Sequence, residues 1–178
     1  AIGYGALSAN AGDGSVAIGK SALTALTSGA GNTAVGYLAA TSMDEGEYNT
    51  VVGYEAYRYA TPTDTNGANT IMGYQAGKFI STGYNNTFIG STAGLGITGT
   101  RLTGDGNTAV GKNAGLLLQG AAHENTFVGQ GSGDVLTTGS DNTCVGFGAD
   151  TDDATAVNQI VIGHSTTGVA DNSVTLGN

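Results

Sequence analysis

The chain has 178 residues, of which 32 are Gly, one is Pro and none is Trp, and only 11% of the residues are charged. Collagen would need much more Pro, and a disordered chain would lack the 39% of apolar residues found here, so both classes are excluded. The 14 acidic and 5 basic residues give a net charge of −9, which disfavours nucleic acid and anionic membrane surfaces as partners.

One phrase recurs along the whole chain. In chain order it reads GNTAVGYLAA from residue 31, then YNTVVGYEAY, ANTIMGYQAG, NNTFIGSTAG, GNTAVGKNAG, ENTFVGQGSG and DNTCVGFGAD. An anchor glycine closes the apolar part of each copy, at Gly3, Gly19, Gly36, Gly53, Gly73, Gly90, Gly111, Gly129, Gly146, Gly163 and Gly177. We therefore expect residues 1–178 to form a single repeat domain.

The anchor glycines are spaced by 16, 17, 17, 20, 17, 21, 18, 17, 17 and 14 residues. This period is too short for helical-pair repeats, and the β-branched, Gly-rich phrase disfavours helix. We predict an all-β fold, a parallel β-solenoid of about eleven coils of about 17 residues, stacked about 4.8 Å apart. The three residues before each anchor glycine form one strand of a coil, from 16–18 to 174–176. A second, weaker strand is predicted at Leu23 and Leu26, Phe79 and Ile80, Leu117 and Leu118, and Val135 and Leu136.

Side-chain direction in the first strand is predicted from its pattern. The residue before each anchor is apolar, and the Thr two residues earlier is replaced by Val16, Ile160 and Val174 in the outlying copies, so both positions are expected to point into the coil. The Asn that opens each phrase is expected at a corner, stacked from coil to coil as an amide ladder. Glycines three residues before it are the expected turn partners, at Gly29, Gly46, Gly83, Gly104 and Gly139.

The position between those two is then expected to point outward. Its occupants are almost all apolar, and exposing Ile71, Phe88 or Phe127 to water would forgo about 1.5–3 kcal/mol each. An apolar stripe along a rod predicts that several chains pack together. The predicted interface residues are Val51, Ile71, Phe88, Phe127, Cys144 and Val161.

Three segments carry a family resemblance: GSVAIGKSAL (14–23), NQIVIGHST (158–166) and NSVTLGN (172–178). They resemble the NSVAIG-type repeat of YadA-like heads in trimeric autotransporter adhesins, and the NTAVGYLA form is similar to repeats of trimeric phage and tail fibres. The resemblance covers essentially the whole chain. It implies a left-handed parallel β-roll, a homotrimer, an extracellular place on a cell surface or tail fibre, and a role in attachment. It also implies that residues 1–178 are a fragment of a longer fibrous surface protein. The family's heads repeat near 14 residues, which only the last spacing here matches.

Aromatic residues point to a receptor contact. Tyr37, Tyr54 and Tyr74 each follow an anchor glycine, so stacked coils would set them in a ladder. The coil of residues 54–69 is long and carries Tyr57, Arg58 and Tyr59 in an insertion, where aromatic rings beside charged groups favour carbohydrate. The extra residues of the coils that end at Gly73 and Gly111 are expected to protrude as loops at about residues 57–68 and 95–106.

No catalytic, cofactor or metal site is expected, and an enzyme is disfavoured. GLGITG (94–99) fits a dinucleotide fingerprint, but no strand–helix–strand unit surrounds it. His123 and His164 are far apart, and Cys144 occupies the stripe. The acidic segment Asp150–Asp153 leaves open a calcium site or a solvated corner. Three functions are carried forward, which are attachment to a cell-surface receptor, a structural spacer without a ligand, and ice binding; the inward Thr speaks against the last.

Overall fold

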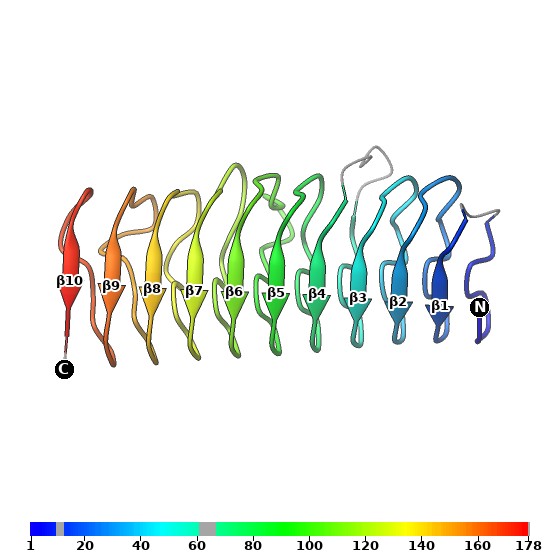
Figure 1. The fold of residues 1–178 in the computed structure, drawn as a ribbon, viewed down its shortest axis with the longest axis horizontal. Coiled ribbons are helices and arrows are strands. Elements are labelled where there is room, and N and C mark those ends of the chain that lie inside the picture. Colours follow the sequence, from blue (N-terminus) through cyan, green and yellow to red (C-terminus); the bar gives the residue numbers. More distant parts are fainter. Residues whose placement is uncertain (10–12, 61–66, 178) are drawn as a thin grey trace.

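In the computed structural model, which describes residues 1–9, 13–60 and 67–177, the chain is a parallel β-solenoid, as predicted. Ten strands within these residues form one sheet in chain order (Figure 1). Their bounds are β1 Val16–Ile18, β2 Thr33–Val35, β3 Thr50–Val52, β4 Thr70–Met72, β5 Thr87–Ile89, β6 Thr108–Val110, β7 Thr126–Val128, β8 Thr143–Val145, β9 Ile160–Ile162 and β10 Val174–Leu176. Each strand therefore ends directly before an anchor glycine.

The number of coils is slightly smaller than predicted. Ten strands joined in sequence enclose nine turns in the described part of the chain, whereas the anchor glycines predicted about eleven coils. The first copy of the phrase contributes only an isolated bridge from Ile2 to Ile18, so it does not add a strand. The register is otherwise uniform, with Thr beside Thr and, for example, Val51 beside Ile71.

The prediction of a second strand in each coil is wrong, because no regular strand forms there in the described residues. The segment that returns behind the sheet consists of turns and isolated bridges, such as those from Ile80 to Leu102 and from Leu102 to Gly120. Left-handed residues interrupt it, among them Leu23 at φ 51° and Tyr57 at φ 52°. An extended strand cannot contain such residues, so the apolar side chains of this segment fill the coil from a succession of turns.

The predicted direction of the strand side chains is also wrong. The middle residue of each of the strands β1 to β9 is buried inside its own coil, and the two flanking residues face outward. Val51, Ile71, Phe88, Phe127, Cys144 and Val161, predicted to contact other chains, are all at most 1% exposed within the single chain. Because both faces of the strand are apolar, the sequence pattern does not determine which face is the inner one. The core is completed by the small residue three positions after each anchor, for example Ala56 and Ala93, and by Leu26 and Met43.

The asparagine ladder is confirmed. Asn32, Asn49, Asn69, Asn86, Asn107, Asn125 and Asn142 are all buried. In one step of the ladder, the backbone N–H and the side-chain amide of Asn49 donate to Oδ1 of Asn32 at 2.9 and 3.1 Å. The side-chain amide of Asn32 in turn donates to the carbonyl of Gly46, one of the predicted turn glycines, at 2.7 Å. The left-handed residue at this corner is the one before the Asn, for example Tyr48.

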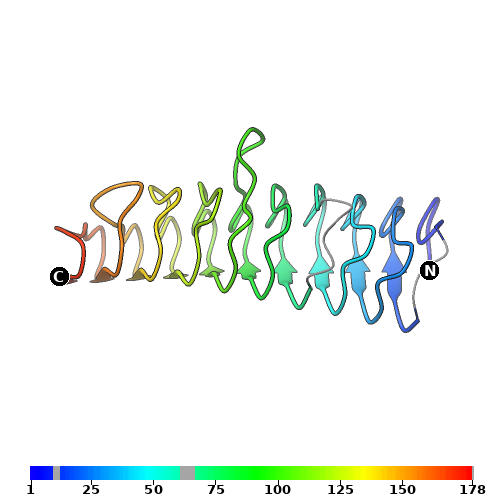
Figure 2. The ribbon, with the colours of Figure 1, turned by 90° about the horizontal axis from the view of Figure 1, so that it is seen from above.

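The anchor position requires glycine because adjacent coils approach closely there. Gly53 has a φ of 144°, and a Cβ on it would lie 2.1 Å from the carbonyl oxygen of Gly73 in the next coil. One of the two predicted protruding loops is visible, because the β5–β6 connection projects beyond its neighbours (Figure 2). Half of the other, at residues 61–66, lies outside the described residues.

Candidate interaction surfaces

The outer face of the sheet carries two parallel columns of side chains. One column is Thr in seven successive strands from β2 to β8. The other is apolar in all ten, at Ile18, Val35, Val52, Met72, Ile89, Val110, Val128, Val145, Ile162 and Leu176. Met72 is 43% exposed, Ile162 42% and Leu176 71%. We call these two columns the outer stripe. An apolar column therefore does run along the rod, but it consists of the residues directly after those that the sequence predicted.

The predicted tyrosine ladder is present beside the end of the strands. Tyr37, Tyr54 and Tyr74 are each between 38% and 52% exposed. Their rings are stacked, with centroids 5.0 Å apart for Tyr37 and Tyr54 and 5.6 Å apart for Tyr54 and Tyr74. The ammonium group of Lys20 lies 5.9 Å from the centroid of the Tyr37 ring. Because the rings cover one another's faces, the ladder offers its edges and hydroxyl groups to a ligand.

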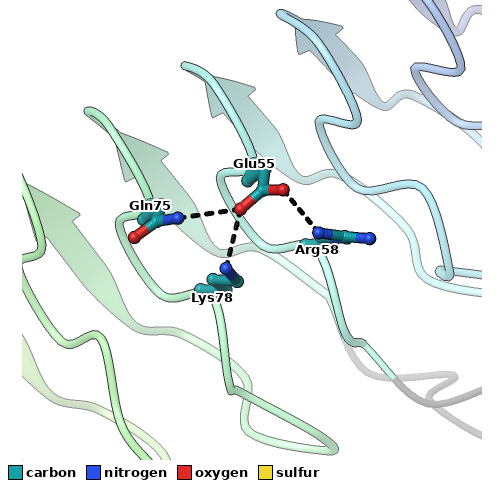
Figure 3. Close-up of polar contacts among 4 residues, drawn as sticks. All are labelled: Glu55, Arg58, Gln75 and Lys78. Carbon is teal, nitrogen blue, oxygen red and sulfur yellow. Dashed lines mark hydrogen bonds and ion pairs between the residues drawn. The ribbon is translucent and has the colours of Figure 1, made fainter.

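Glu55, which follows Tyr54, is held by three polar side chains from two adjacent coils (Figure 3). Gln75 Nε2 donates to Glu55 Oε2 at 2.8 Å, Lys78 Nζ donates to the same oxygen at 2.7 Å, and Arg58 pairs with Oε1. Burial by itself raises the pKa of Glu55, but the hydrogen bonds from Lys78 and Gln75 and the charges of Lys78 and Arg58 outweigh it and lower the pKa. Glu55 is therefore ionised at neutral pH.

Next to this carboxylate, three cations surround a pair of stacked rings. The rings of Tyr59 and Phe79 are nearly parallel, with centroids 5.3 Å apart. The guanidinium carbons of Arg58 and Arg101 lie 4.9 and 5.7 Å from the centroid of the Tyr59 ring, and Lys78 Nζ lies 5.5 Å from that of Phe79. Arg101 also donates to the Tyr59 carbonyl oxygen at 2.9 Å. We call these five residues the basic aromatic cluster.

The structure divides the three predicted contacts of the long coil. Arg58 and Tyr59 lie in the basic aromatic cluster and are half-buried. Tyr57 is fully buried in the core, and its hydroxyl accepts a hydrogen bond from the Asn69 amide at 3.2 Å, so its prediction as a receptor contact is wrong. Ala56 and Tyr57 are buried in this segment, whereas Arg58 and Tyr59 are half-buried, so Tyr57 falls on the inner side.

The repeat pattern did not lead us to predict Lys78, Phe79 and Arg101 as members of this cluster. A signal for two of them was available, because Lys78 and Phe79 follow Gly73 at the same distances as Arg58 and Tyr59 follow Gly53. Stacked coils therefore set Lys78 beside Arg58 and Phe79 beside Tyr59. Arg101 lies in the irregular coil of the projecting loop, where counting from the anchor glycine does not predict position.

Acidic groups gather at two further places. Ligand atoms of His123, Glu124 and Asp141 lie within 4.8 Å of one another, on an exposed corner. In the segment Asp150–Asp153, Asp150 accepts from the backbone N–H of Thr151 at 3.0 Å, and Asp153 accepts from that of Thr155 at 2.6 Å. These carboxylates thus hold the turn itself.

The pKa values of Cys144 and Asp150 are both raised. Burial, and secondarily the charge of Asp150, raises the pKa of the Cys144 thiol to about 12, so the thiol stays protonated and is a poor nucleophile. Burial, with a hydrogen bond and repulsion from Asp134, raises the pKa of Asp150 to about 7. Asp150 therefore keeps its proton well above the usual range of a carboxyl group.

Comparisons of the chain with known protein families, with curated proteins and with solved structures found no match. No helix in the described part of the chain is long and apolar enough to cross a membrane.

Proposed function

We propose that the chain is the repeat domain of an extracellular fibre or adhesin head that assembles as a homotrimer and attaches to a cell-surface receptor. The observation that carries the proposal is the outer stripe, whose apolar column is exposed or half-buried along all ten strands of one face. Soluble monomers rarely expose continuous apolar patches of such extent, and another protein surface usually covers them. Identical copies provide matching stripes of equal length.

The resemblance to YadA-like heads and to trimeric phage fibres supports three chains around one axis and a left-handed coil. With each outer stripe turned toward the axis, the segments behind the sheet remain on the outside of the trimer. Four members of the basic aromatic cluster lie five and six residues after the anchor glycines Gly53 and Gly73, on these returning segments. The cluster would then be repeated three times, and weak single contacts would add up through avidity.

Assembly is tested by one substitution in the outer stripe and a matched control. The wild-type chain should have a mass in light scattering of about three times 17.5 kDa. Val128→Glu places a charge in the stripe and should give a folded monomer, because three buried like charges repel one another. Gln130→Glu adds the same charge two residues away, on the exposed residue after the anchor glycine, and should remain a trimer. A monodisperse wild-type monomer would contradict assembly through this face.

Ice binding is the second candidate because one observation favours it. The Thr column from β2 to β8 points outward, in register from strand to strand, whereas the sequence pattern predicted an inward Thr. An outward column of hydroxyl and methyl groups at a spacing of about 4.8 Å is a regular array. If the outer stripe binds ice, it cannot also be buried between the chains of a trimer. A monomer that shows thermal hysteresis, abolished by Thr87→Asp, would support ice binding over attachment.

A spacer without a ligand is distinguished by attachment itself. Trimers immobilised on beads should adhere to the natural surface if the domain binds a receptor. Intact trimers that adhere nowhere, while a longer piece of the same fibre does adhere, would favour the spacer.

A further inference from the structure

The basic aromatic cluster concentrates positive charge on an acidic molecule. Three of the chain's five Lys and Arg residues contact its rings, although the net charge of the chain is −9. Glu55 is the carboxylate held there, so among the residues that the structure describes in this cluster three positive charges and one negative charge leave a local sum of +2. Like charges this close repel one another, and an excess of this kind attracts an anion.

One carboxylate is already bound in this cluster, and its partners show what the cluster can recognise. Glu55 forms ion pairs with Arg58 and Lys78, whose side chains are 28% and 14% exposed. Arg101, on the Tyr59 ring, is half-buried and forms no ion pair with any described residue. Its hydrogen bond to the Tyr59 carbonyl uses a single N–H of a guanidinium that carries five. The remaining donors of Arg101 suit a second carboxylate.

The rings limit which anion fits. Tyr59 and Phe79 are stacked on each other and are approached by cations, so an inserted nucleobase has no free face to stack on. A long phosphate backbone would also be repelled by the net charge of −9 along the rod. A carbohydrate needs no such insertion, because its hydroxyl groups bond to polar edges.

We propose that the basic aromatic cluster binds a carboxylated oligosaccharide of the uronic acid type, with Arg101 holding the sugar carboxylate. This inference rests on the proposed attachment function and names its ligand class. It does not involve the outer stripe, so binding at the cluster and assembly of the trimer can be measured separately.

The test uses the full chain and calorimetric titration with an oligogalacturonate, a neutral cello-oligosaccharide of equal length, and a DNA duplex. Oligogalacturonate should bind, and the other two should not. Arg101→Gln should weaken binding about tenfold or more, the usual effect of losing a charged hydrogen bond, while Arg101→Lys should recover part of it. Lys112→Gln removes the same charge outside the cluster and should leave binding within about twofold of the wild type.

Each contrary outcome of these measurements leads to a different conclusion. Equal binding of the neutral sugar, or equal loss in Lys112→Gln, would overturn a carboxylate-specific site at Arg101. Binding of DNA that is lost in Arg101→Gln would make the cluster a general anion site and overturn the carbohydrate assignment. Trimers that adhere to the natural surface but bind no oligogalacturonate would overturn this inference alone. Loss of both assembly and adhesion would instead remove the proposed function.

Discussion

The coils from β2 to β5 and those from β7 to β9 share one backbone but carry different surfaces. Both have the buried middle residue, the anchor glycine and the buried amide at the corner, which is Asn through Asn142 and Gln at position 159. Outside, the first region carries the tyrosine ladder and the basic aromatic cluster, whereas the second carries Asp134, Asp150 and neighbouring acids. The inward positions thus determine the fold, and the outward positions of the turns are free to differ. We expect the ligand site in the first region, because its outward side chains form a clustered aromatic and basic surface.

The largest expected effect tests whether the two regions depend on the same core. Phe88 and Phe127 are the fully buried middle residues of β5 and β7. Each Phe→Ala change should destabilise the chain by about 3–5 kcal/mol, because it leaves a cavity that a rigid coil cannot close. Thermal unfolding followed by circular dichroism measures both. Gln130→Glu, on the surface of the same coil as Phe127, is the control. A change below about 1 kcal/mol in either Phe variant would contradict the inward placement of that residue.

The next effect is smaller and has opposite signs in the two regions. The pKa of Asp150 is raised to about 7, so its folded form keeps a proton that the unfolded chain releases at lower pH. Its contribution is neutral below about pH 4, becomes destabilising as the pH rises toward 7, and stays so above that. Asp150→Asn should therefore raise the unfolding temperature at pH 8 and leave it unchanged at pH 4. We expect ~1–2 kcal/mol, less than the shift alone implies, because the aspartate pair is partly solvated.

Glu55 provides the contrast to Asp150. Its pKa is lowered, so it stabilises the fold above the ordinary carboxyl pKa, and this stabilisation is lost as the pH falls through the folded value. Glu55→Gln should lower the unfolding temperature at pH 7 and have little effect under strongly acidic conditions. The same pH response in the Glu55 and Asp150 variants would contradict the electrostatic difference between the regions.

The repeat predicted most of the fold because period, glycine and Asn each have a local physical cause. An anchor glycine is needed where coils touch, and a buried amide is needed where a corner stacks, so both could be read from spacing. The direction of the strand could not be predicted, since Val51 and Val52 are equally apolar and a shift of one residue exchanges the two faces. Position along the returning segment was similarly ambiguous, which is why Tyr57 was predicted outside and lies inside. Arg101 joins the cluster through an irregular loop, and no period predicts such a contact.

The smallest effect concerns the stacked aromatic rings of the residues that follow the anchor glycines. The first region has a column of three such rings, at Tyr37, Tyr54 and Tyr74, and the second has a column of two, at Phe147 and His164. Tyr54 stacks on two rings, at 5.0 and 5.6 Å, whereas Phe147 stacks on the ring of His164 at 5.1 Å. Each stacked pair contributes about 0.5–1.5 kcal/mol beyond the burial of area. If the columns stabilise the rod through stacking, Tyr54→Ala should cost about twice as much free energy of unfolding as Phe147→Ala, with both effects on the order of 1 kcal/mol. A double-mutant cycle of Tyr37→Ala and Tyr54→Ala isolates one contact, and its coupling should vanish if the rings merely coat the surface. Equal costs in both regions together with zero coupling would leave the ladder without a structural role, and its Tyr residues would then be explained by ligand binding alone.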